Sequence, residues 1–77
     1  MAHIRYDIVP ITHGWQVNCN GAAGSPYSDM KNTVLDTLAT AEQLLKRGDK
    51  VEVRLLQLDG TRRVLEPKDA RLYLNRP

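Results

Sequence analysis

The chain has 77 residues, of which 42% are hydrophobic and 26% are charged, and its formal net charge is +2. This length predicts a single domain, residues 1–77, with a core region of 3–66 and a tail of 67–77. The composition excludes a disordered or fibrous protein. Residues 1–45 are slightly acidic and residues 46–77 slightly basic, but the signs are interspersed, as on a solvated surface.

From the sequence we expect neither an export signal nor a membrane-spanning segment. Its first ten residues, MAHIRYDIVP, lack a basic stretch followed by an apolar run of signal-peptide length. No apolar run approaches the roughly 18 residues needed to span a bilayer. The single cysteine, Cys19, cannot form an internal disulfide. We therefore expect a cytoplasmic protein without a membrane partner.

Two alternating segments predict an N-terminal β-hairpin. Loops of two residues (13–14) or four residues (11–14) bring the apolar positions of both segments to one face, whereas odd loops do not. Pro10 favours the four-residue loop. With the shorter loop, a hydrogen bond between the strands would be expected at Pro10, which has no N–H to donate. The apolar positions are Ile4, Tyr6, Ile8, Trp15, Val17 and Cys19.

Residues 21–29, GAAGSPYSD, predict a loop, and a helix follows. Apolar residues at helical spacing indicate its buried face. We expect the helix to begin between residues 29 and 33 and to end at Gly48, which suits the left-handed position after a helix. The apolar face consists of Val34, Leu38, Ala41 and Leu45.

A second hairpin is predicted around Asp59-Gly60, a strong signal for a two-residue turn. Such a turn pairs Leu55 with Val64. It directs Val51, Val53, Leu55 and Val64 toward the core, and Arg54, Leu56, Leu58, Arg63 and Leu65 outward. Pro67 ends the second strand, and the tail predicts either a helical turn or a short fifth strand.

Together these elements predict an α+β domain of order β-β-α-β-β, a four-stranded antiparallel sheet with one helix packed on one face. The expected core is Ile4, Tyr6, Ile8, Trp15, Val17, Cys19, Val34, Leu38, Ala41, Leu45, Val51, Val53, Leu55 and Val64.

Candidate catalytic residues do not form a recognisable constellation. Cys19 and His13 lie about 15–20 Å apart along an extended segment, too far for a nucleophile and its base. By strand alternation, His3 points to the face of the sheet opposite Cys19. We interpret Cys19 as a core residue. The loop before the helix lacks the Lys-Ser/Thr of a phosphate-binding loop. We expect no catalytic activity, metal or cofactor.

The outward leucines, Leu56, Leu58 and Leu65, are unusual on a sheet face that a monomer would expose to water. Val9 and Ile11 also depart from a polar outer face. A β-bulge near Leu55-Leu56 or coverage by the tail would hide these residues. The functional interpretation is an association surface with Arg54 and Arg63 at its rim. It predicts a non-catalytic interaction module. Homodimerisation is favoured over binding of a foreign protein, because symmetric dimers are common.

An alternative prediction is weak nucleic-acid or polyanion binding through the basic hairpin. It is less favoured, because no exposed aromatic residue interleaves with the basic residues and Glu52 and Glu66 dilute their charge. The basic residues are Lys50, Arg54, Arg62 and Arg63.

Five short motifs within residues 4–66 carry a resemblance to a known family. They are Val9-Pro10, Gly14-Trp15-Gln16-Val17, Thr33 with Ala41, Val51-Glu52-Val53 and Asp59-Gly60. In these motifs the chain resembles a family of small uncharacterised bacterial domains. The sequence departs from the family pattern at Thr37 and Leu38, where more alanine is expected. The resemblance implies a β-β-α-β-β domain and supplies no functional residues.

Overall fold

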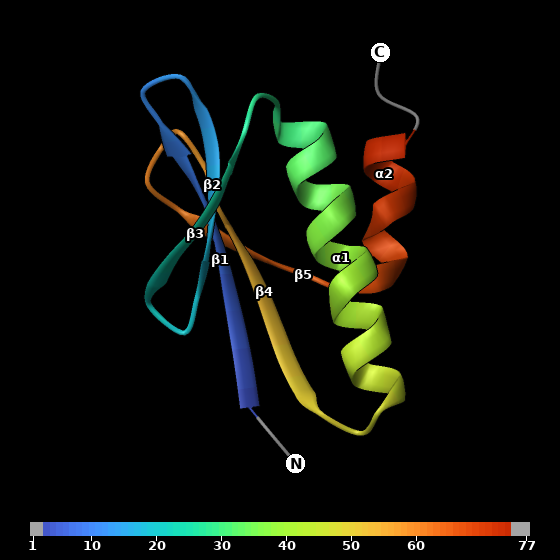
Figure 1. Ribbon diagram of the computed structural model, residues 1–77. Helices are drawn as coiled ribbons and strands as arrows, with labels where there is room; N and C mark the ends of the chain where they lie inside the picture. Colours follow the sequence, from blue (N-terminus) through green and yellow to red (C-terminus); the bar gives the residue numbers. More distant parts are fainter. Residues whose placement is uncertain (1–2, 75–77) are drawn as a thin grey trace.

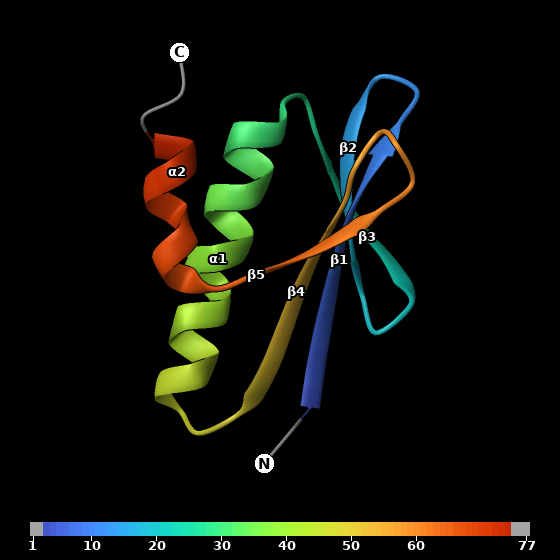
Figure 2. The same cartoon turned by 180° about the vertical axis from the view of Figure 1, so that it is seen from behind.

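A five-stranded sheet and two helices form two layers in the computed structural model, which describes residues 3–74 (Figure 1). The sheet has the strand order β3-β2-β1-β4-β5, and both helices lie on one face of it (Figures 1 and 2). The strands are β1 (His3–Ile11), β2 (Gly14–Cys19), β3 (Ala22–Tyr27), β4 (Lys50–Leu56) and β5 (Arg62–Leu65). The helical elements are α1 (Met30–Lys46), the 3₁₀ turn η1 (Pro67–Asp69) and α2 (Ala70–Leu74).

The first hairpin has the register that Pro10 favoured. Tyr6 lies opposite Cys19 and Ile8 opposite Val17, so the apolar positions of both strands share the helix side of the sheet. Pro10 lies opposite Trp15. The strands extend closer to the turn than expected, because residue 11 also pairs with residue 14.

Residues 22–27, predicted to be part of a loop, instead form the edge strand β3. It pairs antiparallel with β2, with Trp15 opposite Tyr27, and its register shifts between Gln16 and Asn18. Glycine, alanine, serine and proline are poor indicators of a strand. An edge strand nevertheless tolerates Pro26, because no further strand requires the N–H that proline lacks.

The additional strand reverses the direction in which the chain enters the helix. After two strands the chain would return from α1 antiparallel to β1, whereas after three strands it returns parallel. β4 accordingly pairs in parallel with β1, with Tyr6 beside Val53 and Ile8 beside Leu55. The α+β class is confirmed, but the predicted four-stranded antiparallel sheet is wrong in strand number and in this central pairing.

α1 begins at residue 30, within the predicted range of 29–33, and it ends before Gly48 as predicted. The Asp29 side chain accepts a hydrogen bond from the Asn32 N–H at 2.9 Å and caps the first turn. At the other end Gly48 has φ 94°, and its N–H donates to the Leu45 carbonyl at 3.0 Å. The Asp49 N–H donates to the Leu44 carbonyl at 3.1 Å, which completes a Schellman motif.

The second hairpin is shifted by one residue from its predicted register. The Gln57 N–H donates to the Thr61 carbonyl at 2.8 Å, so three residues, 58–60, form the loop. Val53 therefore lies opposite Leu65. Because a one-residue shift exchanges the faces of a strand, Leu65 is 3% exposed in the core and Val64 is 60% exposed. The predicted pairing of Leu55 with Val64 is wrong.

The core lies between α1 and the sheet, and α2 extends it. Six of the fourteen expected core residues are buried in it and six, Cys19 among them, are half-buried, but Leu45 and Val64 are exposed. Of the two structures predicted for the tail, the helical one is present, while residues 75–77 lie outside the described part of the chain. The buried apolar cluster is Ile8, Val34, Leu38, Ala41, Val53, Leu55, Leu65 and Tyr73.

Candidate interaction surface

The sheet has a second face, called here the outer face, which none of the helices within residues 3–74 covers (Figures 1 and 2). Side chains alternate along a strand, and Ile8 is fully buried beneath the helices, so the odd-numbered residues of β1 point to the outer face. Cross-strand pairing and the same alternation extend the outer face from β2 to β5. Its residues include Arg5, Asp7, Val9, Ile11, Gln16, Asn18, Glu52, Arg54, Leu56, Arg62 and Val64.

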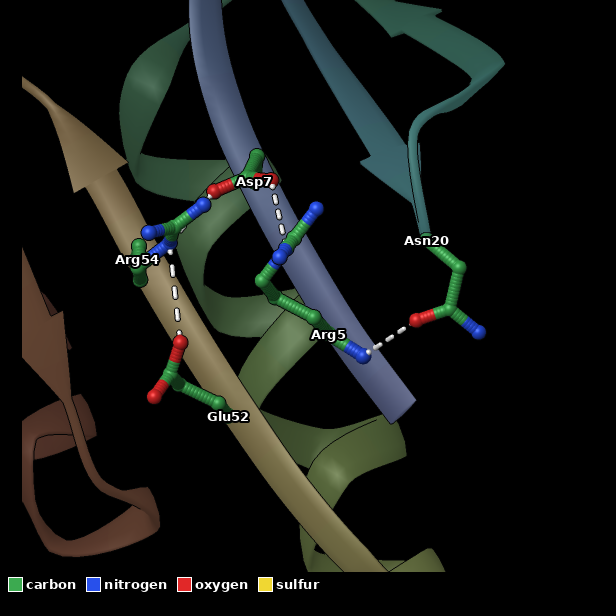
Figure 3. A network of polar contacts seen from close by, with 5 residues as sticks. All are labelled: Arg5, Asp7, Asn20, Glu52 and Arg54. Carbon is green, nitrogen blue, oxygen red and sulfur yellow. Dashed lines mark hydrogen bonds and ion pairs between the residues drawn. The ribbon is translucent and has the colours of Figure 1, made fainter. Parts of the chain in front are cut away.

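A network of charged side chains occupies the outer face of β1 and β4 (Figure 3). Arg54 Nε donates a hydrogen bond to Asp7 Oδ1 at 2.8 Å, and Arg5 Nε lies 3.3 Å from Asp7 Oδ2. Glu52 Oε1 lies 3.6 Å from Arg54 Nε. Asn20 Oδ1 accepts a hydrogen bond from the Arg5 N–H at 2.8 Å and ties the end of β2 to β1. The two arginines and two carboxylates balance one another in charge.

Asp7 is the most strongly held member of this network. Partial burial would by itself raise the pKa of Asp7, whose side chain is 16% exposed. The hydrogen bond from Arg54 and the charges of Arg54 and Arg5 outweigh burial and lower that pKa below its ordinary value. In return, the hydrogen bond to Asp7 raises the pKa of Arg54. The pair therefore carries both charges at neutral pH.

The lowered pKa of Asp7 predicts a loss of stability in acid. A carboxyl whose pKa is lower in the folded than in the unfolded state stabilises the fold above the unfolded-state pKa of about 4. That contribution disappears as the pH falls through the folded-state pKa. We expect Asp7→Asn to lower the free energy of unfolding by up to about 1 kcal/mol at pH 7. Urea unfolding of both proteins between pH 7 and pH 2.5 should show this difference shrinking below about pH 4. A difference that is constant across that range would contradict the role assigned to the Asp7 charge.

Apolar side chains lie beside the charged network. Val9 and Leu56 are half-buried, Ile11 is 40% exposed and Val64 is 60% exposed. Leu58, in the hairpin loop, is 89% exposed, but it borders a hollow on the helix side of the sheet together with Trp15 and Met30. The outer apolar patch is defined here as Val9, Ile11, Leu56 and Val64. Val9 and Ile11 were visible in the sequence as breaks in polar alternation, whereas Val64 was missed because the register of the second hairpin was predicted wrongly.

The structure separates the leucines predicted to form an interface. Leu56 lies on the outer face. Leu58 lies in the loop and borders a hollow on the helix side, and Leu65 is buried against the helices, so neither of these two leucines contributes to the outer surface. The shifted register explains the difference, since it exchanges the positions of Leu65 and Val64.

The four basic residues predicted to bind a polyanion are not brought together. Arg54 is hydrogen-bonded to Asp7. Arg62 and Arg63 are consecutive in β5 and therefore point to opposite sides of the sheet. Lys50 lies at the start of β4, at the far end of that strand from the hairpin loop.

The predicted core cysteine, Cys19, instead lines a hollow between α1 and the β2–β3 half of the sheet. His13 lies in the turn before β2, at the opposite end of that strand from Cys19. Within residues 3–74, no group of three or more His, Cys, Asp or Glu side chains could hold a metal ion. The helices of that same segment are too short or too polar to cross a bilayer.

Comparisons with protein-family models, with curated proteins and with solved structures gave no significant match to this chain. The resemblance to small bacterial domains therefore stays a prediction, and functional inference rests on the surface itself.

Proposed function

We propose that the protein is a non-catalytic interaction module that forms a homodimer through the outer apolar patch. The observation that carries this proposal is the clustering of exposed apolar residues on a sheet face that α1 and α2 leave uncovered. Water contact with such a patch is unfavourable, and contiguous apolar patches with a polar rim are typical of protein interfaces.

The charge of the outer face favours a second copy of the chain over a highly charged partner. Arg5 and Arg54 are paired with Asp7 and Glu52, so the central network offers no excess charge to attract a polyanion. The central networks of two copies therefore do not repel each other. A twofold axis would also place each outer apolar patch against an identical one, as in the commonest symmetric dimers.

The size of the outer face indicates a dimer of modest affinity. Five strands about 4.8 Å apart, with about six residues each at roughly 3.3 Å, present about 400 Å² of flat area before the relief of the side chains is added. A standard interface buries about 800 Å² per partner. The flat area is therefore about half of a standard interface, as expected for a weak dimer that dissociates on dilution.

Sedimentation equilibrium of the wild type and Leu56→Lys tests the proposal. We expect the wild type to approach twice the chain mass of 8.7 kDa at high protein concentration. Leu56→Lys should remain monomeric, because it places a charge inside the apolar contact, at a desolvation penalty of several kcal/mol. Circular dichroism should confirm that the variant keeps its fold, since Leu56 is not part of the buried core.

Leu72→Lys is the matched control. Leu72 is a 51% exposed leucine on α2, in the helical layer, so this variant should dimerise like the wild type. The dimer should persist in 1 M NaCl, where binding to phosphate polymers would weaken steeply. A monomeric wild type, or a dimer split by Leu72→Lys but not by Leu56→Lys, would overturn the proposal. Salt-sensitive binding to heparin would favour the polyanion alternative instead.

A further inference from the structure

A hollow of about 230 Å³ opens between α1 and the β2–β3 half of the sheet, on the helix side of the domain. It exists because α1 packs over the centre of the sheet, whereas β3 lies at the edge of the sheet, beyond the buried core. Tyr6 and Cys19, which are opposite each other in β1 and β2, form part of its floor. Tyr27 at the end of β3 and Asp36 on α1 also line it.

The chemistry of this hollow is that of a site for a positive charge. Asp36 is the only charged side chain lining it, and no Lys, Arg or His of the described residues contributes to the lining. Burial is the main cause that raises the pKa of Tyr27. The negative charge of Asp36 and the hydrogen bond between the two side chains raise it further. Burial is the main cause that raises the pKa of Tyr6, and the electrostatic interaction with Cys19 is the smaller one. Both phenols therefore stay neutral at pH 7.

Two neutral tyrosine rings and one carboxylate are the groups that recognise organic ammonium ions. The faces of aromatic rings attract cations, and quaternary ammonium groups are typical ligands of such aromatic sites. A carboxylate that accepts one phenolic hydrogen bond keeps further lone pairs for a ligand. At about 30 Å³ for each water-sized group, the hollow holds roughly seven or eight non-hydrogen atoms.

We propose that this hollow binds a small organic ammonium ion, with the Asp36 carboxylate and the rings of Tyr6 and Tyr27 as its recognition groups. The site is independent of the homodimer proposed above, because it lies on the helix side of the sheet. Leu56→Lys should therefore bind the cation as the wild type does, and failure of either proposal leaves the other standing.

Titration with choline, followed by amide chemical shifts in NMR spectra, tests the site. The neutral isostere 3,3-dimethylbutan-1-ol serves as the matched ligand, because it has the same shape without the charge. We expect choline to shift amides of residues around the hollow with a Kd on the order of millimolar, and the isostere to bind about tenfold more weakly. Equal shifts from both ligands, or none from choline at 50 mM, would overturn the proposal.

Two variants on the same helix separate the site from general charge effects. Asp36→Asn should weaken choline binding about tenfold, whereas Glu42→Gln, which removes an exposed charge outside the hollow, should not change it. Tyr27→Leu should also weaken binding, while Tyr27→Phe, which keeps the ring, should largely retain it. Equal effects of Asp36→Asn and Glu42→Gln would contradict the site.

Cys19 provides a second readout at the hollow itself. As the only cysteine of the chain it reacts with N-ethylmaleimide at a single position, and it lines the hollow. Bound choline should slow this reaction in proportion to occupancy, and the neutral isostere at the same concentration should slow it less. A rate that choline leaves unchanged at concentrations that saturate the NMR shifts would place the cation elsewhere.

Discussion

Replacement of Leu65 by alanine is expected to lower the free energy of unfolding by about 3 kcal/mol. Leu65 is 3% exposed and lies opposite Val53 within the buried cluster. Truncation removes the free energy of burying the side chain and leaves a cavity that the core fills only in part. Urea unfolding followed by circular dichroism, at one protein concentration for all variants, measures the loss.

Val64→Ala is the matched control for this prediction. Val64 is the preceding residue of the same strand but is 60% exposed, so its truncation should lower the free energy of unfolding by less than about 1 kcal/mol. The two-residue turn predicted from the sequence would exchange the roles of these residues. A larger loss for Val64→Ala than for Leu65→Ala would therefore contradict the observed register.

The elements that could be predicted from the sequence are those specified by neighbouring residues. The helix has a side-chain cap at Asp29 and a glycine at Gly48, and both signals lie within a turn of the helix ends. The register of the first hairpin followed from matching apolar faces and from Pro10, all within 20 residues. In each case the information lies in the segment that forms the structure.

The errors arose where two local structures are nearly equivalent in sequence. Asp59-Gly60 suits a two-residue turn, but Gly60 with φ 90° also closes the three-residue loop that the hydrogen bond between Gln57 and Thr61 defines. β3 has the composition of a loop and gains its structure from pairing with β2. Because one strand was missed, the predicted direction of β4 was wrong, although Val53 and Leu55 were correctly predicted to face the core.

The candidate surface was predictable only in part for the same reason. The outward position of Leu56 followed from alternation along one strand, which is local. The Asp7–Arg54 hydrogen bond joins residues 47 apart through the parallel pairing of β1 and β4, which the antiparallel prediction excluded. The hollow beside Cys19 depends on β3, so it too could not be anticipated.

The strand β3 can be tested directly through Gly14. A Cβ added to Gly14 would lie 2.1 Å from the Tyr27 carbonyl oxygen, and Gly14 has φ 151°, a conformation that other residues rarely adopt. We expect Gly14→Ala to lower the free energy of unfolding by about 3 kcal/mol, because β2 and β3 must separate to admit the methyl group. The same urea unfolding experiment measures this loss.

Gly21→Ala separates the steric effect from the backbone conformation. Gly21 has φ 87°, but nothing lies within 4 Å of a Cβ added there, so only the backbone strain of about 1 kcal/mol is expected. The carbonyl of Tyr27 is close to Gly14 only because β3 pairs with β2. If residues 22–27 formed a loop away from the sheet, Gly14→Ala would be no more harmful than Gly21→Ala. A difference of about 2 kcal/mol between the two variants is thus the expected signature of the fifth strand, and equal losses would contradict it.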